Sequence, residues 1–321
     1  MQTKDLIRRT PALKKIDFEA HAQLPAYAHA MGDVIADRTP IIYDFDAQRL
    51  AEMDAYGVTT QVLSYPGRLN QLSGEEGLAL IRAVNDNSHD AARRHPGRFV
   101  GCAVVPVNDN DAAIAELTRC KHALGLPGWF AHSSNGDLTP DGALLPVVRK
   151  AAELGMFIYL HPAGPTWSRF AGLGPIIEQA YGFHVDTALT LLRLICLGVL
   201  DEYPDLKIIL GHFGEGLPFM LDRLDSMSEL MPSIAPAVNR HSMRHYFRKN
   251  IWVTSSGNYS KAAFECTRAE LGIDHILFGT DFPTERLKKC TDFFDSLALT
   301  KLEREKIFFR NAEDYFGIRA D

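Results

Sequence analysis

Six histidine and carboxylate residues stand at or just after short apolar runs of the sequence. They are Glu19, His21, His161, His212, Glu215 and Asp281. Imidazole nitrogens and carboxylate oxygens bind zinc and manganese, and a catalytic metal site leaves one position open for water or substrate. The donor types therefore predict a mononuclear site for one divalent metal ion, either zinc or manganese.

One strand, turn and helix show how two of these residues are presented. Residues 207–210 form a short β-branched run, residues 211–216 are interrupted by glycines, and residues 217–224 have helical spacing with a proline in the first turn. In α/β barrels such a loop lies on the face that carries the chemistry, and its glycines leave His212 and Glu215 uncovered. The alternative interpretation is a core histidine that follows a buried strand.

Strand and helix patterns alternate along the whole chain, as in a parallel α/β protein. The predicted strands are residues 15–21, 59–65, 99–106, 128–132, 155–161, 207–210, 250–257 and 275–281, and the predicted helices are residues 46–56, 75–94, 109–123, 141–154, 186–203, 217–224, 261–271 and 301–316. Spacing by two places Glu19 and His21 on one face of the first strand. We predict a (β/α)8 TIM barrel that forms a single domain over residues 1–321, with an irregular insertion at residues 22–45 after strand 1. A glycine- and proline-rich segment at residues 163–183 is expected to cover the substrate.

The composition excludes several classes of partner. Hydrophobic residues make up 46% and charged residues 23% of the chain, which is typical of a globular protein. The net charge is -6, with 40 acidic and 34 basic residues and no clustered basic face, so neither nucleic acid nor an anionic membrane is an expected partner. No apolar run is long enough to span a bilayer, and the amino terminus lacks a signal core. The five cysteines are scattered without Cys-x-x-Cys spacing, which favours a reducing cytoplasm.

Each residue of the predicted site also has a structural interpretation. Glu19 could cap a turn, His161 could be a structural residue before a proline, and Asp281 could cap a helix. Their occurrence at several strand ends favours a common site instead. His184 and most other histidines outside this set are interpreted as structural.

The sequence resembles the metal-dependent decarboxylases of the amidohydrolase superfamily over nearly its whole length. The motifs that carry the resemblance are Glu19-Ala-His21, His161-Pro162, Gly211-His-Phe-Gly-Glu-Gly-Leu-Pro218, Thr254-Ser-Ser-Gly-Asn258, Phe278-Gly-Thr-Asp-Phe-Pro283 and Asn311-Ala-Glu-Asp-Tyr-Phe-Gly-Ile318. This branch includes decarboxylases of γ-resorcylate, 2,3-dihydroxybenzoate, 5-carboxyvanillate and aminocarboxymuconate semialdehyde. The resemblance implies a (β/α)8 barrel, one bound zinc or manganese ion, a small carboxylic acid substrate, and homodimers or dimers of dimers.

The same resemblance implies roles for individual residues. The residues that match the metal ligands of this branch are Glu19, His21, His161 and Asp281. His212 is expected beside the metal, and Arg223 is associated with the substrate carboxylate or the subunit interface. The sequence departs from several members at His132, where some have asparagine, and at Thr284, where several have an aromatic residue. We predict that Arg223 and His132 contact the substrate.

Decarboxylation of an aryl carboxylate explains why a metal and an acid would be placed together. Loss of CO2 leaves an unstabilised carbanion unless the ring carbon is protonated first, and a Lewis acid orients the substrate for that step. We predict Asp281 as the proton donor, with His212 and Glu215 tuning its surroundings. The predicted function is a non-oxidative carboxy-lyase for a hydroxy-aromatic or related conjugated acid.

Two other classes of protein fit the same residues. A metal-dependent hydrolase would attack a lactone or amide with metal-bound hydroxide, and Asp281 would act as its base. A non-catalytic metal-binding scaffold ranks last, because a scaffold has no use for histidines and carboxylates at so many strand ends.

Overall fold

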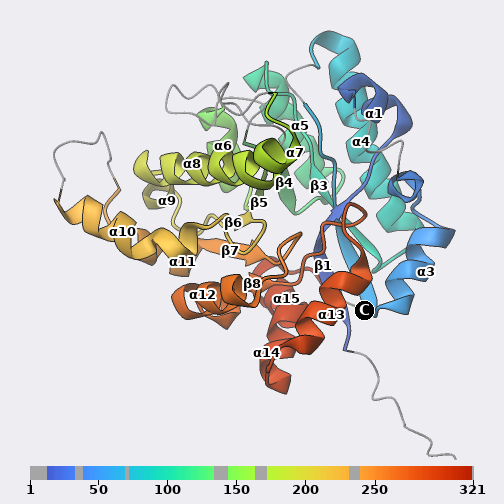
Figure 1. Ribbon diagram of the computed structural model, residues 1–321. Helices are drawn as coiled ribbons and strands as arrows, with labels where there is room; N and C mark the ends of the chain where they lie inside the picture. Colours follow the sequence, from blue (N-terminus) through green and yellow to red (C-terminus); the bar gives the residue numbers. More distant parts are fainter. Residues whose placement is uncertain are drawn as a thin grey trace, which may run out of the picture.

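The protein is a parallel α/β barrel whose helices surround a single sheet (Figure 1). The computed structural model describes residues 13–32, 39–68, 72–133, 144–162, 172–230 and 239–319. Its strands are β1 (Lys15–His21), β2 (Val58–Ser64), β3 (Phe99–Ala103), β4 (Gly128–His132), β5 (Phe157–His161), β6 (Ile208–Leu210), β7 (Ile251–Thr254) and β8 (Ile276–Leu277). The strands are neighbours in sequence order, and every pair from β1·β2 to β7·β8 is parallel. The prediction of a (β/α)8 barrel is confirmed.

The barrel closes where the chain after β8 runs beside β1. The backbone N–H of Phe18 donates to the carbonyl of Phe278 at 2.8 Å, and that of Asp281 donates to the carbonyl of Glu19 at 3.0 Å. A further backbone bond of 2.6 Å joins His21 N to Phe282 O. This closure removes the exposed edges of the sheet and brings the first and last site residues of the sequence together.

Helices fill the connections between the strands. The longer ones are α3 (Ala47–Ala55), α4 (Gly74–Arg94), α5 (Asn110–His122), α6 (Leu145–Glu153), α8 (Phe183–Cys196), α10 (Leu217–Leu230), α11 (Met243–Asn250), α12 (Lys261–Leu271) and α13 (Leu287–Ser296). The shorter elements are α1 (Pro25–Met31), η1 (Pro40–Tyr43), α7 (Pro175–Ile177), η3 (Glu178–Gly182), α9 (Val199–Glu202), η4 (Ile273–His275), α14 (Lys301–Glu305), η5 (Lys306–Arg310) and α15 (Asn311–Phe316).

Several boundaries differ from those predicted, for identifiable reasons. The helix predicted over residues 186–203 is divided into α8 and α9 because Gly198 adopts a left-handed conformation with φ 75°. The closing helix predicted over residues 301–316 contains the π-helical turn η5. Helices α1, α11 and α13 were not predicted. Residues 163–171 of the expected substrate cover lie outside the described residues.

A β-bulge in β1 allows consecutive residues to face the inside of the barrel. Between Asp17 and Ala20 the strand advances three residues while its partner β2 advances two, from Gln61 to Leu63. Such an extra residue turns the side chains that follow it to the opposite face. Phe18 therefore packs in the apolar interior, while Glu19 reaches the polar layer above it.

The amino-terminal end of the barrel is sealed by apolar packing. Phe316 of α15 lies against Phe18 and Phe157, with ring centroids 5.0 and 5.3 Å apart. Further interior side chains, including Tyr159, Ile209 and Leu277, fill the barrel above this layer. Because these side chains close the amino-terminal end, a small molecule would reach the polar residues from the carboxyl ends of the strands.

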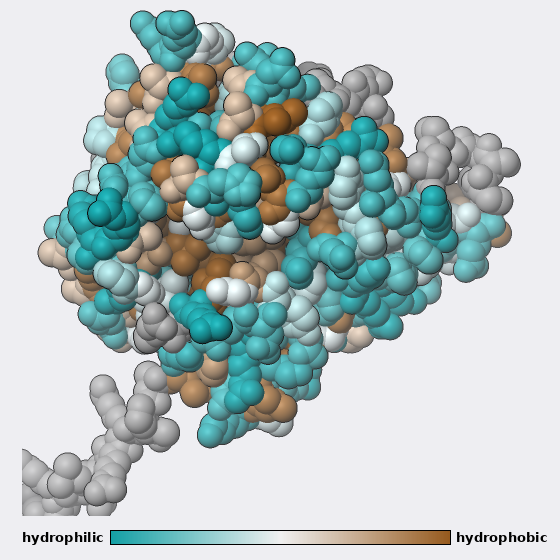
Figure 2. Space-filling view, turned by 180° about the vertical axis from the view of Figure 1, so that it is seen from behind, coloured by the Kyte–Doolittle hydropathy of each residue, from teal (hydrophilic) through white to brown (hydrophobic). Residues whose placement is uncertain are grey.

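The surface drawn in Figure 2 is consistent with a chain in which 23% of the residues are charged. Figure 2 shows one face that is mostly hydrophilic, with hydrophobic side chains gathered in a hollow near its middle. No helix within the described ranges is long and apolar enough to cross a membrane. All five cysteines are free thiols.

Candidate metal centre and active site

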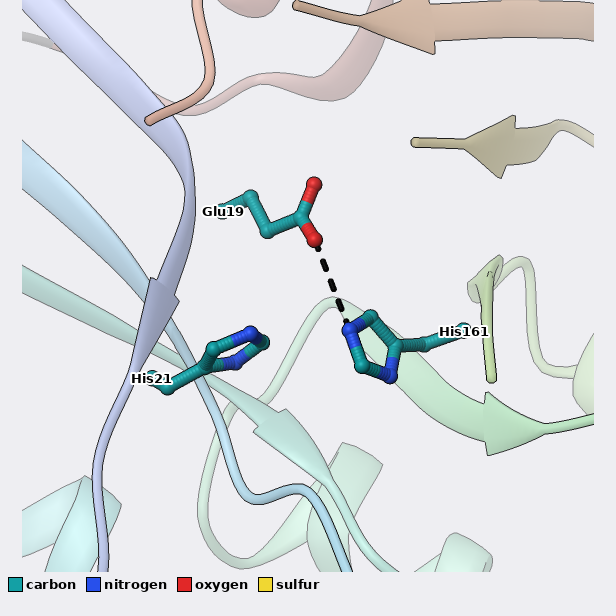
Figure 3. Close-up of side chains that lie close together, drawn as sticks. All are labelled: Glu19, His21 and His161. Carbon is teal, nitrogen blue, oxygen red and sulfur yellow. Dashed lines mark ion pairs between the residues drawn. The ribbon is translucent and has the colours of Figure 1, made fainter. Parts of the chain in front are cut away.

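Glu19, His21 and His161 direct donor atoms into one small space at the barrel mouth (Figure 3). One donor atom from each residue lies within 4.8 Å of the other two. The side chains come from the ends of β1 and β5, and all three residues are buried. The structure therefore brings these three predicted residues together.

The hydrogen bonding of Glu19 leaves one oxygen available for a ligand. Oε2 accepts hydrogen bonds from the hydroxyls of Tyr159 and, at 2.9 Å, of Thr254. Oε1 has no hydrogen-bond partner among the described residues and lies 3.5 Å from Nε2 of His161. Buried carboxylate oxygens are rarely left without a partner, so this arrangement suits a bound cation.

The electrostatics of the cluster lead to the same conclusion. Burial, and then the neighbouring Asp281 carboxylate, raise the pKa of the Glu19 carboxyl. Burial, and then the positive charge of His21, lower the pKa of the His161 imidazole well below its usual range. A neutral imidazole is the form that binds metals, and a dication relieves the repulsion between the neighbouring carboxylates of Glu19 and Asp281. These residues therefore fit a divalent metal ion.

His21 is held so that Nε2 faces the site. Its Nδ1 lies 2.8 Å from the hydroxyl of Ser64, and its carbonyl accepts a hydrogen bond from the buried guanidinium of Arg49. Such support of the second ring nitrogen fixes the orientation of a histidine ligand. Nε2 lies 2.8 Å from Oδ1 of Asp281, which brings this fourth predicted ligand to the edge of the cluster.

The loops that present the polar residues adopt an unusual backbone conformation. His212, Phe213, Glu215 and Asp281 have φ angles of 52°, 59°, 56° and 62°. These left-handed conformations are uncommon for residues other than glycine, and they concentrate at functional sites. His212 and Glu215 are thus presented by a loop of left-handed residues rather than by a regular strand or helix.

His212 and Glu215 form a charged pair beside the cluster of Glu19, His21 and His161. Nδ1 of His212 lies 3.0 Å from Oε1 of Glu215, and Oε2 of the same carboxylate accepts a hydrogen bond from His184. Burial opposes both charges, yet the ion pair lowers the pKa of Glu215 to about 2 and raises that of His212 to about 10. The site therefore contains a buried carboxylate and an imidazolium.

Gly257 lies between the His212–Glu215 pair and Asp281, at the edge of the predicted metal ligands. A Cβ at this position would lie 3.4 Å from Nε2 of His212 and 3.5 Å from Oδ2 of Asp281. Its φ of 64° would also strain any other residue. The imidazole of His212 and the carboxylate of Asp281 therefore both border the space beside Gly257.

Comparison with known proteins places this geometry in a family. The family model described as amidohydrolase matches residues 16–318. The chain belongs to the amidohydrolase family. It is 33% identical over 323 residues to the γ-resorcylate decarboxylase of Rhizobium sp. (strain MTP-10005), a match that covers 95% of this chain and 98% of the relative.

Solved structures agree with the sequence comparison. This amidohydrolase superimposes on 2,6-dihydroxybenzoate decarboxylase complexed with 2,6-dihydroxybenzoate with a TM-score of 0.85 and 31% identity, over 95% of this chain and 99% of that one. A dihydroxybenzoic acid decarboxylase from Polaromonas sp. JS666, with bound manganese and the inhibitor 2-nitroresorcinol, gives a TM-score of 0.86 and 29% identity over 95% and 97% of the two chains.

His132 of this amidohydrolase lies at the end of β4, beside the predicted metal ligand His161. It pairs in register with His161, and the two rings are 6.2 Å apart between centroids. Its side chain is buried, and neither ring nitrogen has a hydrogen-bond partner in the described structure. Burial lowers its pKa to about 3, so the imidazole is neutral at ordinary pH. Two unpartnered nitrogens suit a bound polar ligand.

Arg223 lies on the outer surface, on α10, and is exposed. A surface ion pair with Asp222 or Asp225 would be the ordinary role of such an arginine, but no ion pair joins Arg223 to either residue in the described structure, and Asp225 accepts a 2.6 Å hydrogen bond from Met243 N at the start of α11. On the same helix Phe219 and Met220 are 80% and 42% exposed. Arg223 thus stands beside an apolar surface rather than among the other site residues.

Sequence reasoning missed several residues that support the site. The interpretation of His184 as merely structural overlooked its contact with Glu215. Tyr159 was treated only as part of an apolar strand, and Thr254 was given no role beyond its place in a strand and in a family motif. Asp17 ties the barrel closure together by accepting from the N–H and hydroxyl of Thr280 at 2.9 and 2.7 Å. The alternation of β5 could have revealed Tyr159, which stands two residues before His161 on the same face.

Proposed function

We propose that this amidohydrolase is a metal-dependent, non-oxidative decarboxylase of a hydroxy-aromatic carboxylic acid. The observation that carries the proposal is the buried convergence of Glu19, His21 and His161, with Asp281 at its edge and an imidazolium alongside. The decarboxylases among its relatives match it over nearly the whole chain, which supports this reaction class over hydrolysis.

The metal ligands in this proposal are Glu19, His21, His161 and Asp281. A bound zinc or manganese ion supplies Lewis acidity, which orients the acid and stabilises the electron-rich form of the ring. The Polaromonas relative was solved with manganese, so manganese is the first ion to test, and zinc is the second.

Asp281 is the proposed proton donor to the ring. It receives the proton that the phenol releases on binding and delivers it to the carbon that bears the carboxylate. The bond from this carbon to CO2 then breaks, and its electron pair restores the aromatic ring. His212 borders the same space and, with Glu215 as counter-ion, presents a positive charge to the anionic substrate.

His132 is the proposed contact for a neutral polar substituent of the substrate. Its imidazole is neutral, so it offers one donor and one acceptor, and it does not attract a second carboxylate as a cation would. A hydroxyl group is the substituent that matches such a partner. Hydroxybenzoates with a second hydroxyl group are therefore the preferred candidates.

Arg223 is proposed to act in the site of a second copy of the chain. It lies three and four residues after the exposed Met220 and Phe219, so the three side chains share one side of α10. Aromatic residues, methionine and arginine are enriched at the centres of protein interfaces. A homodimer that buries this side would bring the guanidinium to the partner, where it can bind a carboxylate through two hydrogen bonds.

The cellular setting belongs to the same proposal. All five cysteines are free thiols, which supports a reducing compartment such as the cytoplasm.

A substrate screen tests the reaction class directly. Protein loaded with manganese or zinc is mixed with hydroxybenzoates, naphthoates, lactones and amides, and CO2 release and product formation are measured. The proposal predicts CO2 and the corresponding phenol from at least one ortho-hydroxy acid. Hydrolysis of a lactone or amide, without CO2 from any acid, would identify a hydrolase instead.

A further inference from the structure

His184 connects a surrounding helix to the catalytic loop through a single carboxylate. It is the second residue of α8, and its Nδ1 hydrogen bonds to Oε2 of Glu215. Oε1 of the same carboxylate lies 3.0 Å from Nδ1 of His212. An ionised carboxylate only accepts hydrogen bonds, so both imidazoles donate to it from Nδ1. Glu215 therefore bridges two histidines from separate parts of the chain.

The burial of Glu215 makes the contribution of His184 specific. The carboxylate side chain is 0% exposed, whereas the side chains of His212 and His184 are 18% and 29% exposed. Water cannot readily replace a lost donor at such a carboxylate, and a buried oxygen without a partner is costly. Without the donor on Oε2, Glu215 has to turn toward another partner, which disturbs its bond to His212.

The backbone on both sides shows that this contact needs special geometry. A π-helical turn, η3, immediately precedes α8, and His184 follows it by two residues. Single π-helical turns occur frequently at functional sites. On the other side, His212 and Glu215 both have left-handed backbone conformations. Unusual conformations in two segments thus meet at one carboxylate.

We propose that His184 is a positioning residue for His212, which acts by holding Glu215 so that His212 keeps its Nε2 directed at the substrate space. The inference deepens the proposed decarboxylase function, on which it rests. It assigns a role to a residue that is not in contact with the proposed metal ligands. It differs from general packing, because only the hydrogen bond to Glu215 is required.

Two substitutions separate the hydrogen bond from packing of the ring. The rings of His184 and His212 also pack edge to face, with centroids 4.7 Å apart. His184→Asn keeps an N–H donor at the same number of bonds from Cα as Nδ1, but it removes the ring. His184→Phe keeps a ring and removes the donor. We expect His184→Asn to retain most of kcat, and His184→Phe to lower kcat by about 10- to 100-fold, the scale of a misplaced catalytic group.

The remaining readouts test whether the effect passes through Glu215. The metal content of His184→Phe should stay near the wild-type value, because its neighbours are not the proposed ligands. In a Glu215→Gln background, His184→Phe should cause little further loss of kcat, since residues that act through one another are not additive. Full additivity, or a normal kcat in His184→Phe, would overturn the proposal.

A measurement without substrate separates this proposal from the proposed function. In the zinc-loaded protein, the two imidazole N–H protons bonded to Glu215 should give downfield proton NMR signals that disappear together in Glu215→Gln. His184→Asn should leave the His212 signal in place, and His184→Phe should shift or broaden it. An unchanged His212 signal in His184→Phe refutes the positioning role whatever reaction the enzyme catalyses. A second metal ion per chain, lost in His184→Phe, would instead identify the three residues as a metal site.

Discussion

Replacement of Tyr159 by phenylalanine tests whether the hydrogen bonds to Glu19 prepare it for a metal. The substitution removes one hydroxyl from the buried site and keeps the ring, which packs against Phe130 with centroids 5.6 Å apart. Glu19 Oε2 loses one of its two hydroxyl donors and keeps Thr254 at 2.9 Å. The carboxylate is then freer to rotate, so Oε1 is less often directed at the ion.

The size of the effect follows from the donors that remain. Loss of a group that supports a metal ligand typically weakens metal binding by about 10- to 100-fold. Because Thr254 still holds Oε2, we expect the lower end, about 10-fold, or about 1.4 kcal/mol. Competition between the protein and a chelating indicator, with zinc and with manganese, measures this difference in Kd.

Tyr246→Phe is the matched control. Tyr246 is also buried, and its hydroxyl donates to Asp201 at 2.8 Å, away from the proposed metal ligands. The control is expected to lower the free energy of unfolding by about 1 kcal/mol while its metal Kd stays at the wild-type value. If Tyr159→Phe binds metal as tightly as wild type, the hydroxyl does not orient Glu19 and the argument from its free oxygen is wrong.

The remaining predictions concern the ligands, the charged histidine and the subunit contact. His161→Ala and Asp281→Ala should lose most of the metal found by elemental analysis, and retention of a full equivalent by both would exclude the proposed site. His212→Asn should keep the metal and lose kcat; metal loss would make His212 a ligand. Because folding raises the pKa of His212 to about 10, its stabilisation is complete below its ordinary value of 6.5 and is lost as the pH rises through about 10. In urea melts of metal-free protein, His212→Asn should therefore differ from wild type more at pH 6 than at pH 10, and an equal difference at both would contradict the ion pair. Arg223→Lys should raise KM although the charge is kept, since the planar fork is lost. Mixing inactive Arg223→Ala and Asp281→Ala chains should restore activity in heterodimers, and subunit exchange without recovery would place Arg223 outside the shared site.

The strained loop residues indicate how the fold holds this site together. Left-handed conformations at residues other than glycine cost about 1 kcal/mol or more each. Hydrogen bonds offset this cost where the strain occurs. Phe213 N donates to Thr254 O at 2.7 Å, and Asp281 N donates to Glu19 O at 3.0 Å. The neighbouring strands therefore keep the loops in conformations that the loops alone would not adopt.

Local sequence was sufficient to predict the barrel and four polar residues at three of its strand ends. Buried parallel strands are continuous apolar runs, and a polar residue directly after such a run stands out. Glu19, His21, His161 and Asp281 were recognisable in this way, and the structure brings them together at the barrel mouth. The strand order followed from the alternation of strands and helices, because parallel neighbours need a crossover between them.

Tertiary structure alone decided which groups support these residues. The bulge in β1, which lets Phe18 and Glu19 both face inward, depends on pairing with β2 and leaves no local signal. The bond between Tyr159 and Glu19 joins residues 140 positions apart, and it arises only when the barrel closes.

His184 shows most clearly where sequence reasoning ends. Within its own segment it is one polar residue at the start of an apolar helix, a position that indicates solvent as readily as a site. Its partner Glu215 lies 31 residues away, in a loop whose conformation depends on the neighbouring strands. Burial lowers the pKa of His212, and the charge and hydrogen bond of Glu215 outweigh it. The charge of His212 therefore depends on how the folded loop holds this carboxylate, because a pKa depends on the groups that surround a side chain in space.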